Sequence, residues 1–165
     1  MYSMDGQKGR FEMAEFFSTR NRGESVRGSE AIMKGIAGYG GLYVPDCFEN
    51  IYGKCMKAKS YSDLCSTVLS SFFPKIDISG DVESAYMKFS TNPHLCIKKA
   101  GDLHVMELYH GPTCAFKDFA LSVLPYLMRK SRELEKDSLR TVILTATSGD
   151  TGKAALEAFS DRGTG

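Results

Sequence analysis

The chain has 165 residues, of which 42% are hydrophobic and 25% are charged, and this composition is typical of an ordinary globular domain. Its formal net charge of +1 gives no reason to expect nucleic acid or an anionic membrane surface as a partner. No apolar run is long enough to span a membrane, and the first residues lack the apolar core of a secretory signal, so we expect a cytoplasmic protein.

The N-terminal half predicts a helical module over residues 18–98, preceded by a polar tail at residues 1–17. Residues 29–38 predict a helix that Ser29 caps and that ends at glycines. A short extended piece is expected at residues 41–45.

A stronger helical pattern covers residues 61–73, where apolar side chains recur at helical spacing until Pro74 ends the run. A further short helix is expected at residues 81–89. The expected inward face of the longer helix consists of Tyr61, Leu64, Cys65, Val68, Leu69, Phe72 and Phe73.

The five cysteines are scattered along the chain and none forms a C-x-x-C pair. Their odd number and loose spacing argue against a disulfide framework and against a zinc site. We therefore expect reduced, mostly buried thiols at Cys47, Cys55, Cys65, Cys96 and Cys114.

Residues 99–165 predict the beginning of an α/β domain, because strand-like and helix-like segments alternate there. The β-α-β-α order implies parallel strands and right-handed crossovers. The fold class expected is therefore α/β, with a helical N-terminal module followed by the first βαβα units of a parallel three-layer sheet domain. The expected segments are strand 102–110, helix 118–135 bent at Pro125, strand 139–146 and helix 152–159.

The sequence stops just after a helix of this series, whereas parallel sheets are normally covered on both faces. We therefore expect a truncated chain, the front part of a larger protein. An unfinished sheet exposes apolar surface and a strand edge, which favours self-association.

Lys117 lies between two phenylalanines at the expected start of the helix at residues 118–135. The dipole of a helix disfavours a cation at its N-terminus, which favours the neutral amine that attacks a carbonyl to form a Schiff base. A surface lysine beside a turn built by His110, Gly111 and Pro112 is the alternative.

The stretch TATSGDTGKAA, residues 145–155, joins the second expected strand to its helix and resembles a nucleotide-binding P-loop only in part. The first glycine of the P-loop pattern would fall on Thr147, and its final Ser or Thr on Ala154. Unpaired N–H groups at such a helix start suit a phosphate or a carboxylate, while a plain turn with side-chain caps remains the alternative.

The segments HGPTCAFKDFAL (residues 110–121) and ATSGDTGKAA (residues 146–155) together closely resemble the threonine synthase family. These are pyridoxal phosphate (PLP) enzymes of fold type II, similar to the β subunit of tryptophan synthase. The run STRNRGESVRGSEAIMKGIAGYGGLYVP, residues 18–45, also resembles the opening of that family. The resemblance implies that residues 99–165 begin the PLP-binding domain and that the chain is only the N-terminal portion of the enzyme.

By this resemblance, Lys117 is the catalytic lysine and binds the cofactor as a Schiff base, and Asp150 lies next to the ring hydroxyl of PLP. The implied reaction converts O-phospho-L-homoserine and water to L-threonine and phosphate, with the truncated chain itself inactive. The loop would bind the α-carboxylate of the substrate through Thr147, Ser148, Gly149 and Thr151. Lys153 is expected to be solvated, and His110 to shape the loop. A threonine synthase-like binding or regulatory protein without this activity is the alternative.

Overall fold

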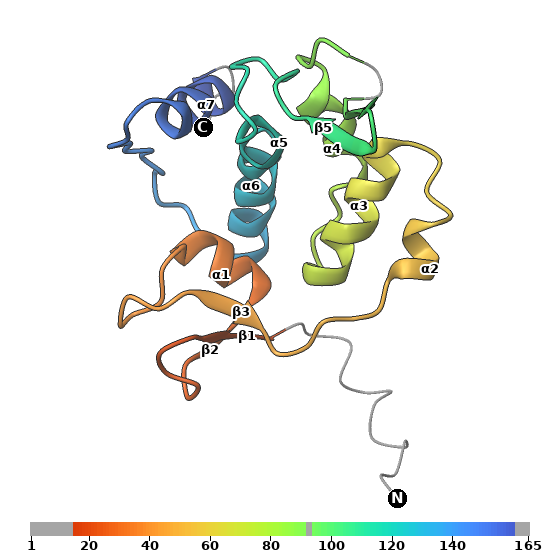
Figure 1. Cartoon of the computed structure of the whole chain (residues 1–165). Coiled ribbons are helices and arrows are strands. Elements are labelled where there is room, and N and C mark those ends of the chain that lie inside the picture. Colours follow the sequence, from red (N-terminus) through yellow and green to blue (C-terminus); the bar gives the residue numbers. More distant parts are fainter. Residues whose placement is uncertain (1–14, 92–93, 161–165) are drawn as a thin grey trace, which may run out of the picture.

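The computed structural model describes residues 15–91 and 94–160 (Figure 1). The strands are β1 (Glu15–Ser18), β2 (Ser25–Arg27), β3 (Tyr43–Pro45), β4 (Cys96–Ala100) and β5 (Leu103–Glu107). The helices are α1 (Gly28–Lys34), α2 (Tyr52–Cys55), α3 (Tyr61–Phe72), α4 (Ser79–Tyr86), α5 (Asp118–Leu121), α6 (Leu124–Glu135) and α7 (Asp150–Ser160).

The N-terminal module contains a small antiparallel sheet in the order β2-β1-β3, which the sequence analysis did not predict. Phe16 on β1 pairs with Val26 on β2, and both side chains are buried against Ala31 of α1. The predicted tail falls mostly outside the described residues, and its last residues, 15–17, belong to β1. The sheet forms because alternate apolar side chains of short segments share one buried face.

Helix α1 begins earlier and ends earlier than the sequence predicted. Arg27, not Ser29, is the N-cap residue, and its backbone N–H donates to the Glu30 carboxylate over 3.1 Å. The Ser29 side chain is instead buried and donates to Glu135 at the far end of α6. Gly35, with a φ of 69°, ends the helix by adopting a backbone conformation that suits glycine.

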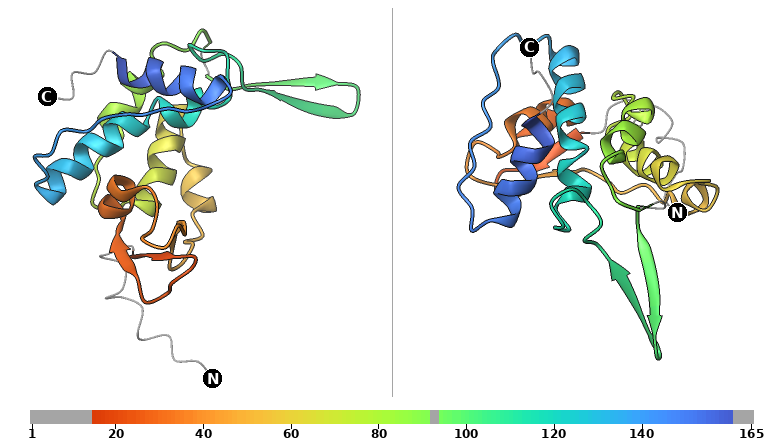
Figure 2. Two further views of the ribbon diagram at one scale, coloured as in Figure 1. Left: turned by 90° about the vertical axis from the view of Figure 1, so that its left-hand side faces the viewer. Right: turned by 90° about the horizontal axis from the view of Figure 1, so that it is seen from above.

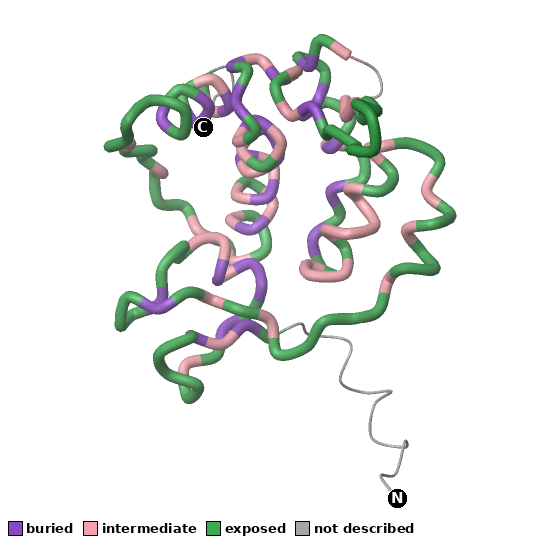
Figure 3. The backbone as a smooth tube through the Cα atoms, in the orientation of Figure 1, coloured by how far each residue is buried: buried purple, intermediate pink, exposed green. Residues whose placement is uncertain are grey.

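The main core lies where α3, α4 and α6 meet, as the buried segments in Figure 3 show. Helix α3 starts after Ser60, whose hydroxyl accepts a hydrogen bond from the backbone N–H of Asp63 over 3.1 Å. The Tyr86 hydroxyl donates to the carbonyl of Phe119 over 2.8 Å. The buried residues of this core are Ile76, Ile78, Val82, Ala85, Tyr86, Phe89, Val123 and Leu127.

The predicted long helix at residues 118–135 is two helices, α5 and α6, that break at residues 122–123. We expected Pro125 to bend one continuous helix. Pro125 instead occupies the first turn of α6, where its missing N–H leaves no intrahelical hydrogen bond unmade.

The predicted strand at residues 102–110 forms as β5, but it pairs antiparallel with β4 rather than parallel with a later strand. Gly101 and Asp102 make the two-residue turn between the strands, and Gly101 has a φ of 62°. The hairpin projects away from the body of the molecule (Figure 2). Local hairpin pairing therefore replaces the long-range pairing that the alternating pattern implied.

Residues 139–146, the second predicted strand, form no strand and have no strand partner in the part of the chain that the structure describes. Leu139, Val142 and Leu144 have exposed fractions of 75%, 77% and 93%. The α/β class is confirmed by this mixture of helices and small sheets, whereas every strand pairing among residues 15–91 and 94–160 is antiparallel. A parallel sheet needs neighbouring strands on which such an apolar segment can pair and be covered.

Helix α7 confirms the last predicted helix. Within residues 15–91 and 94–160, no helix is both long and apolar enough to cross a bilayer. The five cysteines are free, with Cys47 and Cys114 exposed and the others half-buried, so the expectation of mostly buried thiols was wrong. The division of the chain at residues 98 and 99 stays a prediction.

We expect the substitution Ile78→Ala to lower the free energy of unfolding by about 2–5 kcal/mol, because it leaves a cavity in the packed core. Ile78 is 1% exposed, whereas Ile36 is 65% exposed and serves as the matched control. Ile36→Ala should change the stability by no more than about 0.5 kcal/mol in the same urea titration. Equal losses for the two variants would contradict the assignment of the core.

Candidate active site

The loop that precedes Lys117 is folded around the buried carboxylate of Asp118, the first residue of α5. Asp118 is 2% exposed and accepts hydrogen bonds from the backbone N–H of Thr113 over 2.9 Å and from its hydroxyl over 2.6 Å. Thr113 is itself buried. Two hydrogen bonds to a buried carboxylate hold the chain on both sides of Lys117 in one arrangement.

Gly111 completes this arrangement because it has no side chain. A Cβ atom at Gly111 would lie 2.5 Å from both Cβ and Oδ2 of Asp118, which is far inside contact distance. The loop can therefore approach the carboxylate only with glycine at this position.

Lys117 caps α5, and its side chain is half-buried. Its Nζ lies 4.2 Å from the centroid of the Phe116 ring, within the range of a cation–π contact. The carbonyl of Lys117 accepts a hydrogen bond from the backbone N–H of Leu121 over 3.0 Å. The backbone of the lysine is thus fixed, while its amine rests on an aromatic ring and forms no ion pair with any residue that the structure describes.

The second predicted loop, residues 147–151, is held by the side chain of Thr147. Its Oγ1 accepts hydrogen bonds from the backbone N–H groups of Gly149 over 3.2 Å and of Gly152 over 3.0 Å. Gly149 has a φ of 150°, and a Cβ at Gly152 would lie 2.7 Å from Thr147 Oγ1. Thr147 therefore acts inside the loop, as a side-chain cap of α7.

The other predicted residues of this loop face the solvent. Ser148, Gly149, Asp150 and Thr151 are all exposed, and Asp150 is the first residue of α7. Because Thr147 already accepts from the N–H of Gly152, the N–H groups of Asp150 and Thr151, which have no partner within the helix, are the ones left for an anion at this end of α7.

The two loops are brought together by Lys153, which we expected to be solvated. Its Nζ donates to the carbonyl of Thr113 over 3.3 Å, although the residue as a whole is exposed. Helices α5 and α7 also contact each other (Figure 1). The loop that carries Lys117 and the loop at residues 147–151 therefore form one region of the surface.

Asp118 and Thr113 are the residues of this region that sequence reasoning missed. Capping motifs place their two polar residues three positions apart, so the five-residue spacing of Thr113 and Asp118 gave no such signal. His110 lies before the loop, and its Nε2 lies 2.9 Å from the Glu107 carboxylate; its role in shaping the loop stays a prediction.

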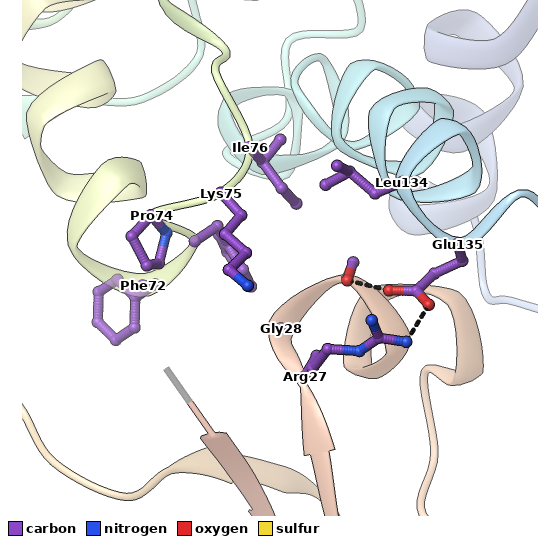
Figure 4. Close-up of a pocket in the computed structure, with 10 residues that line it drawn as sticks. Arg27, Gly28, Phe72, Pro74, Lys75, Ile76, Leu134 and Glu135 are labelled. Carbon is purple, nitrogen blue, oxygen red and sulfur yellow. Dashed lines mark hydrogen bonds and ion pairs between the residues drawn. The ribbon is translucent and has the colours of Figure 1, made fainter. Parts of the chain in front are cut away.

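A separate pocket of about 180 Å³ lies between α1, the end of α3 and the end of α6 (Figure 4). Its charged side chains include Arg27 and Glu135, which form an ion pair with each other. None of the predicted site residues lines this pocket, so it is distinct from the region around Lys117.

Comparison with known proteins finds similarity to one family. A model of the N terminus of threonine synthases matches residues 15–86. The threonine synthase of Schizosaccharomyces pombe is 36% identical over 160 residues, which cover 86% of this chain and 30% of that protein. Threonine synthase-like 2 of Rattus norvegicus is 34% identical over 152 residues, which cover 86% of this chain and 31% of that protein.

The fold is also similar to that of a solved enzyme. The crystal structure of PLP-bound threonine synthase from Brucella melitensis superposes with a TM-score of 0.76 at 34% identity, covering 88% of this chain and 33% of that one. The described fold and its paired loops therefore define a mixed α/β chain that is similar to the N-terminal part of threonine synthases. Over most of its length the chain is similar to the N-terminal part of threonine synthases, and it spans about a third of the length of these relatives.

We expect Gly111→Ala to lower the free energy of unfolding by about 1–3 kcal/mol, because the new methyl group would overlap the Asp118 carboxylate. Gly80→Ala is the matched control, since nothing lies within 4 Å of a Cβ at that position. The control should lose no stability in a urea titration. A Gly111→Ala protein as stable as the control would show that the loop does not pack on Asp118 as described.

Proposed function

We propose that this chain carries the catalytic lysine and the substrate loop of a PLP-dependent threonine synthase. The proposed reaction converts O-phospho-L-homoserine and water to L-threonine and phosphate, as a carbon–oxygen lyase of cytoplasmic amino-acid biosynthesis. The observation that carries the proposal is the hydrogen bond from Lys153 to Thr113, which joins the loop before Lys117 to the loop at residues 147–151.

The residues of this region fit the cofactor. A half-buried primary amine without an ion pair suits covalent attachment of an aldehyde. Lys117 is half-buried and forms no ion pair with the residues that the structure describes. We propose that Lys117 holds PLP and that Asp150, at the start of α7, lies beside its ring hydroxyl. When bound, PLP supplies an electron sink for carbanion chemistry.

The residues of the chain would then have three roles in the reaction. The Lys117 amine, released when substrate binds, would remove and return protons at the α and β carbons. Ser148, Gly149 and Thr151 would bind the α-carboxylate through N–H groups and hydroxyls at the start of α7. Thr147, also predicted to bind the substrate, would contribute mainly by holding this loop through its bonds to Gly149 and Gly152.

Asp118 and Thr113 support this assignment because they fix the backbone around Lys117 without using its amine. Their buried hydrogen bonds hold the backbone on both sides of the lysine. Positioning of this kind lowers the entropy cost of bringing the amine to the substrate.

We further propose that the 165 residues do not turn over by themselves. They span about a third of the relatives' length, and the apolar segment at residues 139–146 has no strand partner among the described residues. An exposed apolar strand also favours self-association of the isolated chain. Residues 99–165 would form the start of the PLP-binding domain.

A second candidate is a threonine synthase-like protein that binds small molecules without this activity. This second candidate is supported by the identity of 34% to threonine synthase-like 2 of Rattus norvegicus, which is close to the 36% identity to the threonine synthase of Schizosaccharomyces pombe. Both candidates use the same loops and differ in whether phosphate is released from O-phospho-L-homoserine.

The assignment of Lys117 predicts where PLP attaches. After incubation with PLP and reduction with borohydride, we expect mass spectrometry to find the adduct mainly on Lys117. Lys117→Arg should abolish it, whereas Lys99→Arg, at an exposed position on β4, should not. An adduct spread evenly over surface lysines would contradict the assignment.

The Lys117→Arg and Lys99→Arg variants also distinguish the two candidate functions when they are made in the longest natural form of the protein that contains these residues. Lys117→Arg should reduce phosphate release from O-phospho-L-homoserine by at least about 10²-fold, because the proton-transfer group is lost. PLP attachment at Lys117 without phosphate release would favour the binding protein.

A further inference from the structure

Three side chains with metal-binding atoms meet at the base of the β4–β5 hairpin, where it joins the body of the molecule (Figure 2). Cys96 and Glu107 are directly opposite each other in the antiparallel register, so their side chains lie on the same face of the hairpin. His110 follows three residues after Glu107 and turns back toward it. One ligand atom from each residue lies within 4.8 Å of the other two.

This spacing is close to that required around a single ion. Zinc binds thiolate sulfur at about 2.3 Å and imidazole nitrogen or carboxylate oxygen at about 2.0–2.2 Å, so tetrahedral ligand atoms lie about 3.3–3.7 Å apart. Small rotations of the Cys96 and His110 side chains would reach this geometry without moving the strands, because both residues are only half-buried.

The carboxylate of Glu107, at the centre of the cluster, already contacts groups whose place a metal ion could take. The Glu107 side chain is 9% exposed, and its Oε1 and Oε2 contact Lys98 Nζ over 2.8 Å and His110 Nε2 over 2.9 Å. Both oxygens of this carboxylate therefore already face hydrogen-bond donors.

Lys98 is the group that a metal would have to displace. Its side chain is 68% exposed, so its ammonium can leave the carboxylate for water at little cost. The backbone of His110 is better fixed, since its carbonyl accepts hydrogen bonds from the backbone N–H of Ser90 over 2.9 Å and from its hydroxyl over 3.2 Å. An exposed lysine thus covers a carboxylate beside a histidine whose backbone is held in place.

We propose that Cys96, Glu107 and His110 form a binding site for a divalent transition metal, with Zn²⁺ as the preferred ion. Sulfur, nitrogen and oxygen donors together suit zinc and cobalt and are poor ligands for Mg²⁺. On binding, the Cys96 thiol loses its proton to solvent as the metal–sulfur bond forms, and no oxidation state changes. Three protein ligands leave a fourth position open to water or to a small ligand.

The bound ion would connect β4, β5 and the residue that precedes the Gly111–Asp118 loop. The cluster was missed in the sequence because no two ligands have the C-x-x-C spacing, and only the hairpin register brings Cys96 opposite Glu107. The proposal rests on this cluster alone and holds whether or not Lys117 binds PLP.

Titration of the purified chain with Co²⁺ tests the site, because a cobalt–thiolate bond gives a charge-transfer absorption band. We expect one Co²⁺ per chain with this band, displacement by Zn²⁺ and no displacement by excess Mg²⁺. Cys96→Ser should abolish the band and weaken binding at least about 10-fold. Cys47→Ser, which removes an exposed thiol outside the cluster, should leave both unchanged.

A second variant distinguishes loss of a ligand from loss of the fold. Lys98→Met removes the competing ammonium and should tighten Co²⁺ binding several-fold, a gain that misfolding cannot produce. Circular dichroism on each variant should match that of the unmodified chain. The proposal fails if the unmodified chain gives no thiolate band, if Cys96→Ser and Cys47→Ser weaken binding equally, or if Lys98→Met leaves the affinity unchanged.

Discussion

The buried side chain of Tyr86 connects the helical core to the segment that carries Lys117. Its ring centroid lies 5.1 Å from those of Tyr61 and Phe89, and its hydroxyl donates to the carbonyl of Phe119, two residues beyond the lysine. Burial raises the pKa of this hydroxyl well above its usual range, so it stays a neutral donor. The loops described above therefore rest on a core that α3, α4 and α6 build.

Much of the helical structure could be predicted from the sequence because its signals are local. Ser60 and Pro74 mark the two ends of α3, and the run at residues 152–159 predicts most of α7. The three-stranded sheet could not be predicted in this way, since it brings β1 beside a strand about 25 residues later through pairing of very short segments. The dipeptide Gly101–Asp102 is a local sequence signal for the two-residue hairpin turn between β4 and β5.

The same contrast between local signals and contacts between distant segments applies to the candidate site. Lys117 and the loop at residues 147–151 follow from the composition of two short segments and from the family resemblance, and their roles stay predictions. Their supports depend on contacts between segments. The bond between Lys153 and Thr113 spans 40 positions, and no periodic pattern identifies the acceptor. The burial of Asp118 depends likewise on a glycine seven positions earlier.

The exposed segment at residues 139–146 is held at both of its ends. The Arg132 side chain donates to the carbonyl of Leu139, and Thr147 is fastened to the first turn of α7. A backbone segment with fixed ends has already lost much of its conformational entropy before it meets a partner. A strand that paired with this segment would therefore meet a backbone already held at its two ends, so its ordering cost would be smaller than for pairing with a free coil.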